Sequence, residues 1–143
     1  MLLRGWRMVA LFSVCAGIAL AAETPDGMSD AEVAEFLETL QQAVRADKPE
    51  AIAALTAFPL RVDVGGRVMR IADAKEFAKS YRSLFTKPVR DAVLAQKASA
   101  LLRNAQGSMI GGGEVWFSGI CEDVACGRSR VAIIAVNVPK AKR

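Results

Sequence analysis

The apolar positions of the chain first follow a helical period. Ser29 and Glu32 are spaced as a capping box, and apolar residues then recur every three or four positions, which predicts a helix over residues 30–46. Its core-facing positions are Val33, Phe36, Leu37, Leu40 and Val44. Asp47, followed by Pro49 in the first turn, predicts the start of a second, short helix.

A period of two replaces the helical period from Phe58 onward. Apolar and charged residues alternate over residues 60–64, and Gly65-Gly66 then supplies the positive φ angles of a two-residue hairpin turn. A return strand is predicted over residues 68–71. The turn fixes the register of the two strands, and this register gathers the apolar side chains on one side of the hairpin.

On the other side of the hairpin, this register places Arg61 opposite Arg70. Like charges directly across two strands are unfavourable unless a negative group lies with them. Asp63 pairs with Val68 and lies diagonally from Arg70, so it is one candidate for that group. Three explanations stay open: a structural ion-pair cluster, an anionic ligand or partner carboxylate, or a different register.

The rest of the chain predicts two more helices and then strands. Asp73 with Glu76 caps one helix, and Thr86 with Pro88 begins another that ends near Ala95. The inner face of the first of these comprises Phe77, Tyr81, Leu84 and Phe85. Strands are predicted over residues 98–103, 108–120 and 129–138, with a turn at 104–107. This order predicts an α+β fold with N-terminal helices on one face of an antiparallel sheet.

Three stretches carry a resemblance to a known family: FPLRVDVGGRVMRIADAKEFAKSYRSLFT, GSMIGGGEVWF and VAIIAVNV. Over residues 29–138 the chain resembles the nuclear transport factor 2-like superfamily, in particular its small exported bacterial members of uncharacterised function. The resemblance implies a cone-like fold whose helices pack into a strongly curved sheet, often around a pocket, and a homodimer formed through the sheet face. It implies no single activity, because this fold serves enzymes, binding modules and dimerisation domains alike.

The N-terminus has the three zones of a secretory signal peptide. Arg4 and Arg7 precede an uncharged run over residues 8–20, which ends in small residues suited to cleavage after Ala21. An uncleaved anchor is the alternative, but a spanning helix needs about 20 apolar residues. Lipidation at Cys15 is disfavoured because a valine precedes it. We expect an exported protein, periplasmic or secreted, with no stable membrane anchor after cleavage.

Cleavage divides the chain into a leader (1–21), a flexible N-terminus (22–28), one α+β domain (29–138) and a basic tail (139–143). The chain carries 19 basic and 15 acidic residues, and removal of the two leader arginines lowers the net charge from +4 to +2. Part of the remaining positive charge lies in the tail. Nucleic-acid binding is therefore not predicted, because it needs a basic patch on a folded face.

Removal of the leader also leaves an even number of cysteines. Of the three in the chain, Cys15 is lost, while Cys121 and Cys126 flank a short loop. A metal site is not predicted, because C-x4-C offers two ligands and the chain has no His. A redox-catalytic pair would need C-x-x-C spacing. In an oxidising compartment we expect a disulfide between the two cysteines.

Few side chains are available for chemistry inside a cone. Tyr81 is the only tyrosine, and its hydroxyl needs a partner in the core, for which backbone is the expected one. In the superfamily's isomerase- and dehydratase-like enzymes, Tyr and Asp or His groups inside the cone polarise a carbonyl or move a proton. Because this chain has no His, Asp63 or Glu114 would have to serve as the general base.

Three successive glycines at residues 111–113 interrupt the long predicted strand. They are not a phosphate loop, because no Lys-Ser/Thr follows and no helix begins there. We expect them to form a bulge or sharp bend within a strand. Glu114 and Trp116 follow directly, and two interpretations stay open: both line a pocket mouth, or Trp116 is core and Glu114 is solvated.

No catalytic motif and no cofactor-binding motif is recognisable in the sequence. We therefore expect a non-catalytic exported module that binds a small anionic or apolar ligand, or a protein partner. The candidate ligand-binding residues are Arg61, Asp63, Arg70, Tyr81, Glu114 and Trp116. The alternative is a small carboxylate-dependent isomerase, dehydratase or hydrolase acting in the cone pocket.

Overall fold

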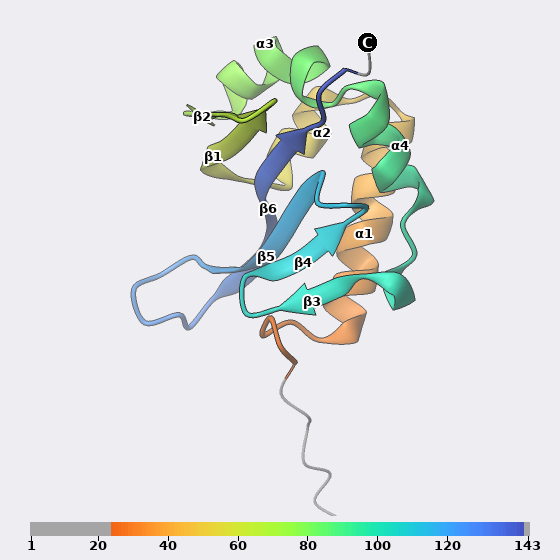
Figure 1. The fold of residues 1–143 in the computed structure, drawn as a ribbon. Helices are drawn as coiled ribbons and strands as arrows, with labels where there is room; N and C mark the ends of the chain where they lie inside the picture. Colours follow the sequence, from red (N-terminus) through yellow and green to blue (C-terminus); the bar gives the residue numbers. More distant parts are fainter. Residues whose placement is uncertain (1–23, 142–143) are drawn as a thin grey trace, which may run out of the picture.

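A computed structural model describes residues 24–141, in which helices pack against one six-stranded sheet (Figure 1). The elements are α1 (Asp30–Arg45), α2 (Pro49–Ala54), β1 (Thr56–Val64), β2 (Arg67–Ile71), α3 (Ala74–Leu84), α4 (Lys87–Ala95), the 3₁₀-helix η1 (Ala98–Ala100), β3 (Leu102–Asn104), β4 (Gly107–Ile110), β5 (Val115–Cys121) and β6 (Ser129–Val138). The predicted α+β class is confirmed, whereas the finer cone shape stays a prediction. The predicted signal peptide lies outside the described residues, and no helix within them is long and apolar enough to cross a bilayer.

Two helices begin at the predicted caps. The Ser29 hydroxyl accepts a hydrogen bond from the backbone N–H of Glu32 at 3.2 Å, and the Glu32 carboxylate accepts one from the backbone N–H of Ser29 at 2.8 Å. At the start of α3, the Asp73 carboxylate accepts a hydrogen bond from the backbone N–H of Glu76 at 2.8 Å. Both caps satisfy backbone donors that the first helical turn leaves free.

The start of α2 differs from the prediction. Lys48, not Asp47, occupies the N-cap position, and its side chain makes no capping hydrogen bond. Asp47 instead adopts a left-handed backbone with a φ of 52°. Its carboxylate accepts a hydrogen bond from the Tyr81 hydroxyl on α3, so it joins two parts of the chain and does not cap a helix.

The strand order across the sheet is β2-β1-β6-β5-β4-β3. All neighbouring pairs are antiparallel except β1 and β6, the second and third strands in this order, which are parallel. The expected antiparallel sheet is therefore corrected to a mixed sheet. The periodicity of a strand indicates which of its side chains are buried, but it does not indicate which strand lies beside it. The parallel pairing of β1 with β6 also joins strands that are far apart in the sequence.

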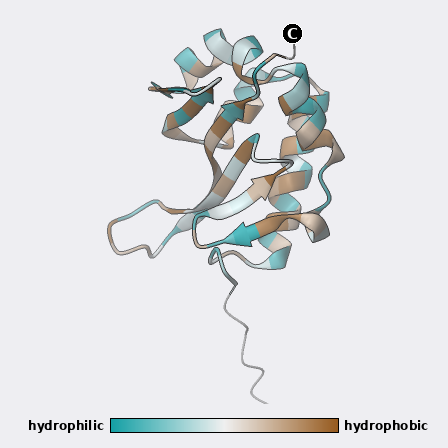
Figure 2. Cartoon of the chain, viewed as in Figure 1, coloured by the Kyte–Doolittle hydropathy of each residue, from teal (hydrophilic) through white to brown (hydrophobic). Residues whose placement is uncertain are grey.

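The β1–β2 hairpin has the predicted register. Arg61 lies opposite Arg70, and Asp63 lies opposite Val68. The two turn glycines, Gly65 and Gly66, have φ angles of 60° and 94°, as a two-residue hairpin turn requires. Hydrophobic and hydrophilic residues alternate along β1 in Figure 2, in keeping with one buried and one exposed side.

The C-terminal strands are shorter and more numerous than predicted. Residues 98–103 form η1 and only the start of β3, and residues 108–120 fall into two strands, β4 and β5. The glycines at 111–113 form the turn between β4 and β5, not a bulge inside one strand, and Gly111 and Gly113 adopt φ angles of 63° and 110° in it. The pairing of Ile110 with Val115 closes this turn.

One face of the sheet, the inner face, packs against the helices, and α1, α3 and α4 each contact β6. The Phe36 ring of α1 lies 4.7 Å from the Phe117 ring of β5 between their centroids. The fully or almost fully buried side chains of the inner face are Leu60, Val62, Ile110, Val115, Phe117, Ile133 and Val136. They form one apolar cluster with the buried helix residues. The opposite side is called the outer face below.

Candidate functional site

A row of side chains crosses the outer face of the sheet. Met109 pairs with Trp116, Trp116 with Ala135, Ala135 with Arg61, and Arg61 with Arg70. These residues alternate with the buried inner-face residues, so they all point away from the helices. Three of the six predicted site residues thus share one row that neighbouring strands contribute.

A hollow of about 510 Å³ lies at one end of this row. Its lining comprises Met109, Gly112, Gly113, Glu114, Trp116, Asn137, Val138 and Pro139. The hollow therefore combines an aromatic ring, a thioether, a carboxylate, an amide and backbone groups. Of the two interpretations of Glu114 and Trp116, the structure supports the one in which both line a pocket.

The turn between β4 and β5 shapes the hollow. The Glu114 carboxylate accepts a hydrogen bond from the backbone N–H of Gly112 at 2.6 Å, which holds the acidic side chain beside the turn. A Cβ atom added to Gly113 would lie 3.5 Å from Sδ of Met109 and 3.6 Å from Nε1 of Trp116. The glycine thus leaves the indole and the thioether uncovered on the hollow side.

Asn137 joins the turn to the arginine row, and the sequence analysis missed it. Its side-chain amide donates to the carbonyl of Gly113 at 2.7 Å, and its backbone N–H donates to the carbonyl of Glu114 at 2.8 Å. Its Oδ1 accepts a hydrogen bond from Nη1 of Arg61 at 3.5 Å. A single polar residue inside the apolar run VAIIAVNV was the signal that could have identified it.

The arginine pair on the outer face is not neutralised by Asp63. The Asp63 carboxylate accepts a hydrogen bond from the backbone N–H of Gly66 at 2.7 Å and so stabilises the hairpin turn. Among residues 24–141, no carboxylate lies within salt-bridge distance of Arg61 or Arg70. The described residues thus form no ion-pair cluster around the two arginines, the predicted register is confirmed, and the external anion stays a prediction.

Tyr81 lies on the inner side of the sheet, away from the other candidates. Its ring stacks on that of Phe85 at 5.6 Å between centroids, and its hydroxyl donates to Asp47 at 2.9 Å, so the backbone partner expected for it is wrong. Burial, together with the hydrogen bond to Asp47, raises the pKa of Tyr81 to about 12. The structure does not bring Tyr81 together with Asp63 or Glu114, which lie on the outer face and in the β4–β5 turn.

The carboxylate beside Tyr81 belongs to a partly exposed ionic cluster. Arg82 and Arg90 lie 3.6 Å and 3.9 Å from the Asp47 carboxylate, whose side chain is 37% exposed. A general base that works against Tyr81 would need a carboxylate free to take a proton inside a closed cavity. Here the Asp47 carboxylate already accepts a hydrogen bond from the Tyr81 hydroxyl and faces the guanidinium groups of Arg82 and Arg90. Because Asp47 follows α1 and the two arginines lie on α3 and α4, the cluster is suited to holding these three helices together.

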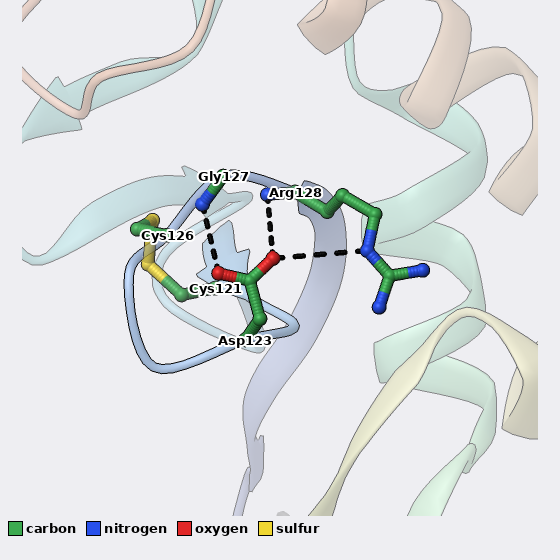
Figure 3. Close-up of a disulfide and its surroundings, with 5 residues drawn as sticks. All are labelled: Cys121, Asp123, Cys126, Gly127 and Arg128. Carbon is green, nitrogen blue, oxygen red and sulfur yellow. Dashed lines mark hydrogen bonds and ion pairs between the residues drawn. A yellow bond between two sulfur atoms is a disulfide. The ribbon is translucent and has the colours of Figure 1, made fainter.

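The two cysteines are bonded to each other at the base of the β5–β6 connection (Figure 3). Within this loop, the Asp123 carboxylate accepts hydrogen bonds from the backbone N–H groups of Gly127 at 2.8 Å and Arg128 at 2.9 Å. The expected disulfide between Cys121 and Cys126 is thus present. The loop projects away from the body of the domain in Figure 1, and it lies at the opposite end of β5 from the β4–β5 turn.

A second charged cluster, which the sequence analysis missed, holds the segment before α1. The guanidinium group of Arg103 donates to both oxygens of Asp26, at 2.8 Å and 2.6 Å, and also to Asp30 and to the carbonyl of Met28. The Asp26 side chain is fully buried, and the hydrogen bonds from Arg103 lower its pKa to about 2. Residues 24–28, expected to be flexible, therefore make specific contacts, and no periodic pattern in the sequence marks them.

The sequence was compared with protein-family models and with curated proteins. No family model and no curated protein matches the sequence significantly. The resemblance described above therefore stays a prediction, and the function has to be inferred from the geometry of this chain alone.

Proposed function

We propose that this protein is an exported, non-catalytic binding module, and that the outer-face hollow beside Trp116 holds a small ligand with an apolar part and an anionic group. The observation that carries the proposal is the juxtaposition of an open aromatic surface with the guanidinium group of Arg61, which has no carboxylate within salt-bridge distance among residues 24–141. Trp116 and Met109 line the hollow, and Arg61 reaches its rim through Asn137.

The chemistry of the hollow favours such a ligand. Indole and thioether groups offer polarisable surface to an apolar moiety, and a guanidinium group binds carboxylate or phosphate oxygens with paired hydrogen bonds. The Glu114 carboxylate is held back by the backbone N–H of Gly112, so it does not neutralise Arg61. On the inner face, in contrast, buried side chains such as Phe77 and Phe117 occupy the space in which a cone pocket would lie.

Export is part of the proposal. The predicted leader and the disulfide of Cys121 with Cys126 both support an oxidising compartment, since such bonds persist outside the reducing cytosol. A homodimer through the sheet face, which the resemblance implies, would cover the outer-face hollow. We therefore expect ligand binding to lower the dimer fraction if that dimer forms, which light scattering after size-exclusion chromatography can measure.

The chain offers a direct test, because it contains two tryptophans and the predicted cleavage removes Trp6, leaving only Trp116. Anilinonaphthalene sulfonate, an aromatic anion, serves as the probe, and uncharged N-phenylnaphthylamine serves as its matched control. We expect the anion to bind and to receive energy from Trp116, with affinity falling about tenfold in Arg61→Met. The control should be insensitive to that substitution.

A matched variant separates the hollow from general surface charge. Arg45 is exposed at the end of α1, distant from the outer face, and Arg45→Met should leave binding of the anion unchanged. Equal affinity for the anion in the native protein and in Arg61→Met, or an absence of energy transfer from Trp116, would contradict the proposal. Native mass spectrometry of molecules that co-purify with the cleaved protein then identifies the natural ligand.

A further inference from the structure

The edge strand β2 has β1 on one side and, within the part of the chain that the structure describes, no strand on the other. In a two-residue hairpin, the residues that flank the turn exchange both backbone hydrogen bonds, and every second pair after them does the same. Arg67, Met69 and Ile71 therefore bond to β1, whereas the backbone N–H and C=O groups of Val68 and Arg70 point away from the sheet. Among residues 24–141, these outward groups have no hydrogen-bond partner.

The side chains of this edge are apolar in the middle and basic at both ends. Val68 is 54% exposed and Met69 is 43% exposed, on opposite faces of the strand. Arg67 and Arg70 flank them, and both are exposed. An exposed apolar pair on an unpaired strand edge is suited to pairing with another extended chain.

The positive charge at this edge is not neutralised within the described residues. Arg61, Arg67 and Arg70 have no carboxylate within salt-bridge distance in residues 24–141. The acidic side chains nearest to this edge along the chain are those of Asp63, Asp73 and Glu76. Each of these carboxylates accepts a hydrogen bond from a backbone N–H group, in turn that of Gly66, Glu76 and Ala72.

The start of the basic tail adds to this charge. The aliphatic part of Lys140 lies against Gly65, with its Cγ 3.3 Å from the position that a Cβ would occupy. Its ammonium group is therefore held at the turn end of the β1–β2 hairpin. The described part of the tail thus extends the basic surface of β2.

We propose that β2 is a docking edge for an extended, acidic segment of a partner protein, which adds to the sheet as a seventh strand through the backbone of Val68 and Arg70. Strand addition uses main-chain hydrogen bonds for affinity and alternate side chains for specificity. The pattern Arg-Val-Met-Arg over residues 67–70 is complemented by Glu-Val-Val-Glu, which places a carboxylate opposite each arginine and valines between them.

A second copy of this chain is the less suitable occupant. Because Val68 and Arg70 carry the outward backbone groups, an antiparallel pair of copies places Arg70 opposite either Val68 or Arg70 of the other copy. Each register joins two edges whose arginines have no carboxylate within salt-bridge distance among residues 24–141. Like charges directly opposite each other destabilise a strand pair. The unneutralised arginines therefore disfavour self-association and favour an acidic partner.

The test uses the cleaved protein and the labelled peptide Thr-Glu-Val-Val-Glu-Thr, with Thr-Lys-Val-Val-Lys-Thr as its matched control. Fluorescence polarisation should detect binding of the acidic peptide and much weaker binding of the basic one. The double variant R67E/R70E should lose about tenfold in affinity for the acidic peptide and should gain affinity for the basic one. Lys97→Glu, which reverses an exposed charge between α4 and η1, should change neither.

The backbone part of the proposal has its own variant. Val68→Pro removes the outward N–H donor without touching a bond to β1, and edge strands tolerate proline at such positions. We expect at least a severalfold loss of peptide affinity in this variant. In the unsubstituted protein, the amides of Val68 and Arg70 should become protected from hydrogen exchange when the acidic peptide is added, a measurement that needs no variant to fold.

Several results would overturn the proposal. They are an absence of binding by the acidic peptide at millimolar concentration, equal binding of both peptides, and unchanged exchange at Val68 and Arg70. Binding to phosphatidylglycerol vesicles without binding to the peptide would assign the edge to a membrane, and dimerisation lost in R67E/R70E would assign it to a second copy. Trp116→Ala should not affect peptide binding, so failure here is distinguishable from failure of the proposed outer-face ligand site.

Discussion

The two edge strands of the sheet both carry arginine, and the structure treats these arginines in opposite ways. On β3, the side chain of Arg103 is 15% exposed, and its guanidinium group binds both oxygens of the buried Asp26 side chain. On β2, Arg67 and Arg70 are exposed and have no carboxylate nearby within the described residues. The β3 edge is therefore bound through Arg103 to the segment before α1, whereas the arginines of the β2 edge are exposed to solvent.

The difference between the two edges follows from whether the arginine side chains are buried or exposed. A buried charge must be paired and hydrogen-bonded, because the cost of removing it from water is large. An exposed charge is under no such requirement, and a cluster of like charges on a strand edge mainly influences what can approach it. Arg103 therefore belongs to the stability of the fold, whereas Arg67 and Arg70 are the arginines on which the proposed docking at β2 depends.

The largest effect should come from breaking the anchored edge. Arg103→Met leaves the Asp26 carboxylate buried without its partner, and removal of one member of a buried pair costs about 3–5 kcal/mol. Urea unfolding followed by circular dichroism measures this loss. Asp30→Asn is the matched control, because Asp30 binds the same guanidinium group but is 94% exposed, and it should cost less than about 1 kcal/mol. Equal effects of the two substitutions would contradict the distinction between the edges.

A smaller effect should follow from titration of the same edge. The pKa of Asp26 is about 2 in the folded protein, below the ordinary value of 3.8, so the folded state favours the ionised carboxylate. This contribution, about 2 kcal/mol, is fully present above about pH 5 and is lost as the pH falls through 3.8 toward 2. The gap in unfolding free energy between the native protein and Asp26→Asn should narrow over that range. If the difference in unfolding free energy between the two proteins stayed constant from pH 6 to pH 2, the titration of Asp26 would not contribute to stability.

The smallest effect should come from the open edge. Arg70→Met removes the like-charge pair with Arg61 and should leave the free energy of unfolding unchanged or raise it by about 0.2–1 kcal/mol. Thermal unfolding at low and high salt measures it, and any gain should shrink as salt screens the repulsion. A loss of more than 1 kcal/mol would show that Arg70 has a structural role like that of Arg103.

Local patterns predicted those parts of the fold that local interactions determine. The capping box at Ser29 and the register of the Gly65-Gly66 hairpin follow from residues close together in sequence, and both are confirmed. The parallel pairing of β1 with β6 could not be predicted in this way, because it joins Arg61 to Ala135 across most of the chain. The glycines at 111–113 were ambiguous, since positive φ angles serve bulges and turns equally.

In the candidate site, too, residues marked by a local pattern could be predicted, and residues defined by contacts between distant segments could not. Trp116 and Glu114 were identifiable because an aromatic and an acidic residue directly follow three glycines. Asn137 was missed because its partners, Gly113 and Arg61, come from distant parts of the sequence. Asp63 was one candidate partner for Arg70 because the two are diagonal neighbours, but its carboxylate accepts a hydrogen bond from the backbone N–H of Gly66.

The place of β6 in the sheet has a consequence for how this chain acquires its structure. The last strand lies at the centre of the sheet, between β1 and β5, and its side chains complete the packing of three helices. Residues 129–138 follow the other five described strands in the sequence, so β1 with β2 and β3 with β4 and β5 stay two separate parts of the sheet until β6 has been synthesised. Contacts between distant segments also form slowly. The strand β6 is therefore the element that joins the two parts, and the sheet cannot form as one unit before it is in place.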